Sequence, residues 1–284
     1  KEAEEGKYQY MVTDYPGTIG LRFNFINGGT SGLMSNVKIR KAISYSIDRE
    51  EMIDAVYGRY NPAYSYVAPA ITFNGSSYRS QVGEVIEDEY NEYVGDPDKI
   101  VALFQEGLDE LGVETPIEDI TLTYLTSGST TEVQAEREYI QQSLEETLGL
   151  TVELSVAGDT SLFIADRNEG NYDFFLGGWY SDYNDPLDFL YTNYTDAYGM
   201  SFGGYSNTDY DALADQLVGE TDMDKRLDIY KQMEQILLLD DCAFAPIYYA
   251  TKQVLLQNWV KDYRTSSFGA SAEFIWTYID GKNQ

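Results

Sequence analysis

The 284-residue sequence contains no histidine, a single cysteine and few basic residues. Without histidine the chain cannot build a Ser-His-Asp or Cys-His catalytic site, nor a zinc site with imidazole ligands. Cys242 lies in the apolar stretch LLLDDCAFAP and has no intrachain disulfide partner, so we expect a buried, unreactive thiol. No apolar run approaches the roughly 20 residues of a membrane-spanning helix.

The deficit of basic residues leaves 19 Lys and Arg against 48 Asp and Glu, a formal net charge of −29. Because such a chain repels phosphate backbones, we expect no nucleic-acid partner. Apolar residues still make up 43% of the sequence, enough for a folded core. The 26 tyrosines predict either a groove for an amphipathic ligand or a solvated tyrosine-rich surface.

The hydrophobic pattern predicts an α/β fold. Residues 119–126, 150–156 and 172–178 have strand character and alternate with helical segments at 130–148 and 159–168. Strands that alternate with helices imply right-handed crossovers and a largely parallel sheet. In such sheets, ligands bind beyond the carboxyl ends of the strands.

Further elements are predicted on both sides of this unit. Asn36, Asp48 and Asp96 each precede an amphipathic segment and are expected to cap a helix. We also expect strands at 18–27 and 245–256, helices at 207–219 and 222–239, and a long ordered loop at 59–95.

The stretch FFLGGWYSDYNDPLDF, residues 174–189, places aromatic and acidic side chains directly after the third predicted strand. Gly177 and Gly178 allow another segment to approach the backbone closely. Asp182 and Asp185 could form the acid/base pair of a glycoside hydrolase, with Trp179 as a platform for a sugar ring. The oxygens of SDYNDPLD could instead bind calcium, but the spacing does not match an EF-hand loop.

A third interpretation assigns Asp182 to the capture of an ammonium group. A carboxylate in an aromatic mouth is costly to desolvate unless a cation pairs with it, and the α-amino group of a peptide is such a cation. The preceding GGWY residues could then pair with the peptide backbone as an added strand. On the local sequence alone, Asp182 could equally cap a turn through its own side chain.

Three segments resemble conserved patterns of one protein family: NVKIRKAISYSIDREEMI, GGWYSDYNDPLDFL and RLDIYKQMEQILLLDDCAFAPIYY. The chain is similar to the C-terminal half of the oligopeptide- and dipeptide-binding proteins of ABC importers, extracellular solute-binding protein family 5. The resemblance implies a periplasmic-binding-protein-like α/β fold (type II, cluster C) with two lobes that close over the ligand. Residues 20–245 would form the second lobe, and residues 1–19 and 246–284 would belong to the first.

The resemblance also implies a role for individual residues. Asp182 matches the aspartate that pairs with the peptide α-amino group, and Gly178, Trp179 and Tyr180 match the segment that lies antiparallel to the ligand. Tyr183 and Asn184 belong to the same ligand-binding motif without a defined contact. Some family members carry a disulfide at the position of Tyr180, which this chain cannot form.

The implied function is non-enzymatic: a receptor that binds short extended peptides, without metal or cofactor, and delivers them to a membrane permease. Some family members bind nickel complexes, haem or oligosaccharides, so the ligand class is an expectation. We expect a monomer located outside the cytoplasm, as a surface lipoprotein or in the periplasm, with its signal segment outside this sequence. A carbohydrate-binding or glycoside-hydrolase lobe that uses Asp182 and Asp185 is the alternative.

Overall fold

The computed structural model describes residues 8–195, 202–268 and 272–282. Its centre is a six-stranded sheet in the order β2-β8-β1-β7-β5-β6. The bounds of these strands, in chain order, are β1 Tyr8–Phe23, β2 Asn61–Pro62, β5 Thr121–Ser127, β6 Thr151–Ala157, β7 Phe174–Tyr180 and β8 Phe244–Gln257. Two further small sheets pair β3 (Thr72–Phe73) with β4 (Ser76–Ser77), and β9 (Val260–Lys261) with β10 (Tyr278–Ile279).

The sheet is mixed. Strand β5 pairs in parallel with β6 and β7, as the alternating pattern predicted. Strand β1 is antiparallel to both β7 and β8, and β8 is antiparallel to β2. The parallel part is therefore confined to three strands, and the expectation of a largely parallel sheet holds only for that half.

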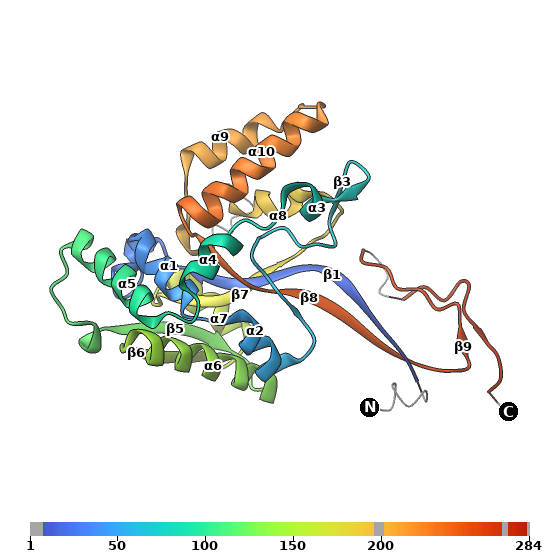
Figure 1. The fold of residues 1–284 in the computed structure, drawn as a ribbon, viewed down its shortest axis with the longest axis horizontal. Coiled ribbons are helices and arrows are strands. Elements are labelled where there is room, and N and C mark those ends of the chain that lie inside the picture. Colours follow the sequence, from blue (N-terminus) through green and yellow to red (C-terminus); the bar gives the residue numbers. More distant parts are fainter. Residues whose placement is uncertain (1–7, 196–201, 269–271, 283–284) are drawn as a thin grey trace.

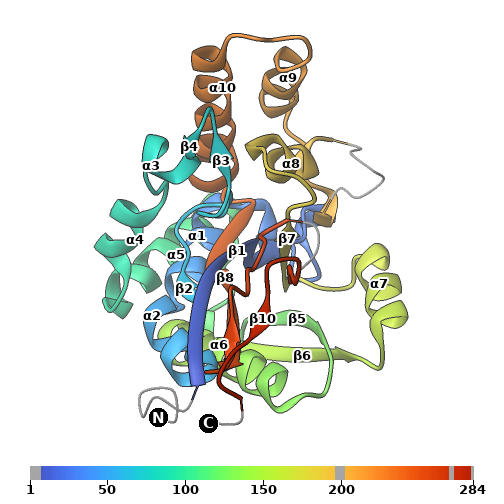
Figure 2. The ribbon, with the colours of Figure 1, turned by 90° about the vertical axis from the view of Figure 1, so that its right-hand side faces the viewer.

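Helices cover both faces of the sheet (Figure 2). One apolar cluster joins the sheet to α1 (Val37–Tyr45), α5 (Pro97–Leu111) and α6 (Thr131–Leu148). A second cluster joins the other face to α8 (Pro186–Leu190), α9 (Thr208–Gln216) and α10 (Met223–Gln235). Helix α7 (Thr160–Glu169) contributes Phe163 to a small third cluster around Phe175.

The helix starts lie where the capping residues predicted them. The Asn36 side chain accepts hydrogen bonds from the backbone of α1, and the Asp48 side chain does so for α2 (Arg49–Met52). Asp96 caps α5 in the same way, with Pro97 in its first turn. A short π-helical turn, Ile53–Tyr57, follows α2, and a second one, Ile236–Asp240, follows α10.

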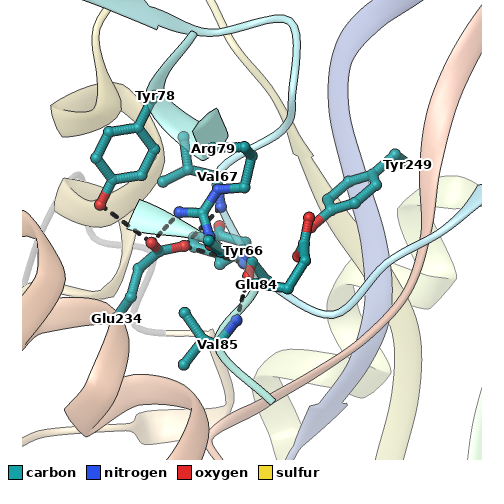
Figure 3. Close-up of polar contacts among 10 residues, drawn as sticks. Tyr66, Val67, Tyr78, Arg79, Glu84, Val85, Glu234 and Tyr249 are labelled. Carbon is teal, nitrogen blue, oxygen red and sulfur yellow. Dashed lines mark hydrogen bonds and ion pairs between the residues drawn. The ribbon is translucent and has the colours of Figure 1, made fainter. Parts of the chain in front are cut away.

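The segment 59–95 is more structured than the long loop expected from the sequence. It contains β2, β3, β4, α3 (Tyr78–Val82) and α4 (Glu87–Tyr93). Its centre is tied to α10 by the fully buried Glu234, whose carboxylate pairs with Arg79 (Figure 3). The same carboxylate accepts hydrogen bonds from the backbone of Tyr66 and Val67 and from the Tyr78 hydroxyl.

Strands β1 and β8 extend beyond the body of the molecule as a two-stranded ribbon (Figure 1). Both strands are buried within the body, but side chains before Pro16 on β1 and after Ala250 on β8 are largely accessible. The register of the pair shifts between Asp14 and Thr18, close to the same point. The ribbon thus leaves the body at an irregularity in the β1–β8 pairing.

Cys242 lies in the core with 3% of its surface exposed, and burial raises the pKa of its thiol to about 11. The predicted burial of this cysteine is confirmed. None of the helices within the described ranges is both long enough and apolar enough to cross a membrane.

Candidate functional site

The candidate site lies at the carboxyl end of β7, where one edge of this strand is open. Every residue of β7 pairs with a residue of β1, from Phe174 opposite Phe23 to Tyr180 opposite Gly17. On the other edge, β5 pairs with β7 only at Phe174 and Phe175. No strand in the described part of the chain pairs with the last residues of β7 on that side.

The register identifies which backbone groups face the open edge. The Ser181 N–H donates to the Pro16 carbonyl at 2.7 Å, so Ser181 is a hydrogen-bonded partner of β1. Since hydrogen-bonding directions alternate along a strand, the backbone groups of Trp179 also face β1. Those of Gly178 and Tyr180 point away from β1, toward the open edge.

Gly178 permits the close packing of β7 on β1. A Cβ atom at this position would lie 1.9 Å from the Thr18 carbonyl oxygen, far inside contact distance. The prediction that this glycine allows a close backbone approach is confirmed. Strand β7 ends at Tyr180 rather than at residue 178, so Trp179 and Tyr180 are part of the strand and not of the turn that follows.

The turn after β7 is organised by Asp188, which is 7% exposed. One of its carboxylate oxygens, Oδ2, accepts three hydrogen bonds: from Trp179 Nε1 at 2.9 Å, from Ser181 Oγ at 2.7 Å and from the Asp182 N–H at 2.8 Å. Asp188 is not among the residues predicted from the sequence to form the site. An acidic residue among apolar neighbours, here the buried Pro186, Phe189 and Leu190 of α8, is the feature of the sequence that could have indicated a buried carboxylate with hydrogen-bond donors around it.

Asp182 and Asp185 have different environments. The Asp182 side chain is exposed, and no lysine or arginine of the described residues forms an ion pair with it. Asp185 Oδ1 caps α8 by accepting from the Leu187 N–H, and also accepts from the Tyr230 hydroxyl at 2.8 Å. Asp185 Oδ2 lies 3.9 Å from the Arg226 guanidinium. Asp185 is therefore a structural acid, which argues against its use in an acid/base pair with Asp182.

Asn184 fixes the tip of the turn to the 59–95 segment. Its Oδ1 accepts from the Thr72 N–H at 2.8 Å, and its Nδ2 donates to the Thr72 hydroxyl at 2.6 Å. Thr72 belongs to β3, close in sequence to the residues that Glu234 anchors (Figure 3). The side chains of Tyr180 and Tyr183 are about half exposed, at 48% and 47%.

The predicted site residues thus fall into two groups. Gly178, Trp179 and Tyr180 form the strand end, and the exposed Asp182 and Tyr183 follow them in the turn. Asn184 has its side-chain amide committed to Thr72. The backbone groups of Gly178 and Tyr180 on the open edge therefore have no strand partner among the described residues, and an exposed carboxylate follows two residues later in the chain.

Residues 1–201 match the family model described as "Bacterial extracellular solute-binding proteins, family 5 Middle". The chain belongs to this family. The resemblance noted in the sequence is thereby confirmed.

Among curated relatives, the chain is 30% identical over 249 residues to the dipeptide-binding protein DppE of Bacillus subtilis, which covers 87% of this chain and 42% of that protein. It is 30% identical over 234 residues to the oligopeptide-binding protein OppA of the same organism, over 81% of this chain and 39% of that protein. The chain therefore spans less than half the length of these relatives.

Among solved structures, the chain is similar to Listeria monocytogenes OppA bound to peptide, with a TM-score of 0.76 and 29% identity. The match covers 98% of this chain and 52% of that one. An oligopeptide ABC transporter substrate-binding domain from Bacillus anthracis has the same fold, with a TM-score of 0.78 at 24% identity. These relatives are binding proteins by name, and they lend no support to the carbohydrate-binding or glycoside-hydrolase alternative.

Proposed function

We propose that this chain is the second lobe of an importer receptor that binds short peptides in extended form. The single observation that carries the proposal is the open edge of β7 beside an unpaired, exposed carboxylate. A peptide could add to this edge as a strand through the backbone groups of Gly178 and Tyr180. Its α-amino group would then reach Asp182, which follows Tyr180 by two residues.

Backbone pairing of this kind would tolerate many peptide sequences, because the hydrogen bonds do not involve ligand side chains. The α-amino group is common to all unmodified peptides, so one carboxylate can fix the register of every ligand. Metal and cofactor have no part in this mechanism, and no catalytic step is required.

In this proposal the remaining enclosure comes from a first lobe, to which the β1–β8 ribbon leads. The boundary expected near residues 20 and 245 falls inside these two strands, and the change in burial at Pro16 and Ala250 lies a few residues further along the ribbon. Large apolar side chains are exposed along the ribbon and the C-terminal arm: Tyr10, Val12, Leu255, Phe274, Ile275, Trp276, Tyr278 and Ile279. Packing against a first lobe would remove them from water.

The proposed receptor works outside the cytoplasm as a monomer and delivers its ligand to an ABC permease in the membrane. Ligand contacts made with both lobes would shift an open–closed equilibrium toward the closed state that the permease recognises.

The proposal is tested by isothermal titration of a two-lobe protein that contains this chain, with a set of tetrapeptides and a set of oligosaccharides. We expect several unrelated tetrapeptides to bind and the sugars not to bind. Binding of oligosaccharides without binding of any peptide would refute the proposal.

A further inference from the structure

One carboxylate oxygen connects the end of β7 to the turn that follows it. Oδ2 of Asp188 accepts a hydrogen bond from the Trp179 indole N–H, with the two heavy atoms 2.9 Å apart, and another from the Asp182 backbone N–H at 2.8 Å. Trp179 belongs to β7, whereas Asp182 lies in the turn. A single atom therefore relates the position of Asp182 to the end of the strand.

Both sides of this connection are anchored in the packed core. Asp188 lies in α8, and the two residues that follow it, Phe189 and Leu190, are fully buried. The Asp188 N–H donates to the Asp185 carbonyl at 3.1 Å, which fixes the first turn of the helix. The Trp179 ring packs against the second apolar cluster, which also contains Phe189 and Leu190. The acceptor and the indole thus have defined positions.

Hydrogen bonds alone compensate the charge of Asp188 within the part of the chain that the structure describes, since no lysine or arginine there forms an ion pair with it. The third donor to Oδ2 is the Ser181 hydroxyl at 2.7 Å. A buried carboxylate is costly unless donors surround it, and hydrogen bonds to an ionised acceptor are stronger than neutral ones. Asp188 therefore holds the backbone at Asp182 firmly.

The Asp182 side chain is exposed, so the location of its carboxylate depends on how the backbone is held. In the proposed function, a peptide pairs with the backbone of β7 and presents its α-amino group to Asp182 at the same time. The two contacts add fully only when their spacing is fixed before the ligand arrives, because ordering a loose turn on binding reduces affinity.

We propose that Asp188 is a positioning residue for ligand recognition: it acts through Asp182, whose carboxylate it holds at a fixed place relative to the end of β7. The inference rests on the proposed function, since it assumes that Asp182 receives the α-amino group. Asp188 itself makes no contact with the ligand in this arrangement.

The test compares one tetrapeptide in free and N-acetylated form on a two-lobe protein that contains this chain. Calorimetry gives the ratio of the two dissociation constants, which we expect to be about a hundredfold or more for the wild type. Asp188→Ala should lower this ratio about tenfold, chiefly by weakening the binding of the free peptide. Asp188→Asn keeps an oxygen acceptor and should retain most of the ratio.

Asp173→Ala is the matched control at the opposite end of β7. Asp173 is fully buried and also accepts three hydrogen bonds: from the N–H and the hydroxyl of Ser31, and from the Thr123 N–H. Its loss should lower the melting temperature as Asp188→Ala does, yet leave the ratio for the two peptides unchanged. A role of Asp188 in stability alone would make the two variants behave alike.

A double variant tests whether Asp188 acts through Asp182. Once Asp182→Asn has removed the charge that distinguishes the two peptides, adding Asp188→Ala should lower their ratio no further. If Asp188→Ala shows no cooperative thermal unfolding, Asp188→Ser replaces it, because a single shorter hydroxyl removes the shared carboxylate acceptor.

Two results would overturn the inference while the proposed function stands. One is a wild-type ratio in the alanine variant, or in the serine variant where that replaces it. The other is an equal loss in Asp188→Asn and Asp188→Ala, which would assign the effect to the charge of Asp188 rather than to the placement of Asp182. If the wild type binds no peptide, or binds both forms equally, the proposed function itself fails and this inference fails with it.

Discussion

The half-buried carboxyl group of Glu136 should make the stability of this protein decrease between acidic and neutral pH. Glu136 lies on α6 and accepts a hydrogen bond from the Tyr57 hydroxyl. Burial raises its pKa from 4.5 to about 7; the negative charge of Glu132 adds to the rise, and the bond from Tyr57 opposes it. The folded protein therefore favours the protonated form of this acid.

The sign follows from proton binding in the two states. Between pH 4.5 and 7 the folded protein holds a proton on Glu136 that the unfolded chain has released, so raising the pH through this window favours unfolding. A difference of about 2.5 pKa units, from 4.5 to about 7, corresponds to at most about 3 kcal/mol of the free energy of unfolding. The loss is complete above pH 7 and absent below pH 4.5.

Glu136→Gln removes the titrating group and keeps its shape. We expect the variant to match the wild type near pH 4 and to exceed its free energy of unfolding by up to about 3 kcal/mol at pH 8. Urea unfolding of both proteins at half-unit steps from pH 4 to 8 measures the difference. Glu138→Gln, the same change at an exposed position of α6, controls for the loss of one negative charge.

Only the difference between variant and wild type is informative, because many other acids titrate in both proteins. A difference that stays constant from pH 4 to 8 would refute the reasoning. So would a wild type that is more stable than Glu136→Gln at pH 8.

Three further substitutions test the scaffold of the site. Arg79→Ala leaves the buried Glu234 without its cation and should lower the free energy of unfolding by about 3–5 kcal/mol in chemical denaturation; an effect below 1 kcal/mol would contradict the buried ion pair. Asp188→Ala removes the acceptor of three hydrogen bonds and should lower the free energy of unfolding by at least about 2 kcal/mol. Asp188→Asn keeps an oxygen at this position and should lower it less. Equal decreases in melting temperature for the two variants would contradict the role of Asp188. Gly178→Ala should lower the free energy of unfolding by about 1–3 kcal/mol, because the new Cβ overpacks against Thr18. Gly158→Ala, where the new Cβ meets only Leu162 at 3.4 Å, should be tolerated. Similar melting temperatures for the two variants would contradict the close packing of β7 on β1.

The sequence predicts well what depends on near neighbours along the chain. Asn36, Asp48 and Asp96 cap their helices through hydrogen bonds to residues two or three positions away, so their pattern is legible locally. The parallel strands β5 and β6 and their helices follow from hydrophobic periodicity in the same way.

Contacts between distant residues escape that kind of prediction. Strand β1 begins at Tyr8, ten residues before the predicted strand, because residues 8–14 pair with β8, whose Tyr8 partner is Gln257 at the far end of the chain. The 59–95 segment is ordered by Glu234, more than 150 residues away from Arg79 and Tyr78. Nothing in the sequence around Glu234 indicates that it contacts Tyr78 and Arg79.

The tyrosines show the same limit. The sequence predicted a tyrosine-lined groove or a solvated tyrosine surface, and a pocket lined by Tyr15, Tyr60 and Tyr180 agrees with the groove. Many other tyrosines are buried with their hydroxyls hydrogen-bonded across the fold, such as Tyr66 to Arg22 and Tyr249 to Glu84. Burial of this kind depends on polar partners that only the tertiary structure brings together.

In the candidate site, the sequence predicted the motif at residues 174–189, but it did not predict the different structural roles of the acids within it. Asp182, Asp185 and Asp188 are three acids at intervals of three residues, and the sequence cannot rank them. The structure distinguishes them through their partners: Asp188 accepts from the turn, Asp185 caps α8 and binds Tyr230, and Asp182 remains exposed.

In the proposed function, Asp182 binds the α-amino group of a peptide aligned on β7. Calorimetric titration of a two-lobe protein that contains this chain, with one tetrapeptide in free and N-acetylated form, tests it most directly, and Asp182→Asn is the matched variant. We expect acetylation to weaken binding to the wild type by about a hundredfold or more, the scale for losing a charge pair enclosed between the lobes, and to weaken binding to Asp182→Asn far less. Equal affinity of the wild type for the free and the acetylated peptide would contradict it.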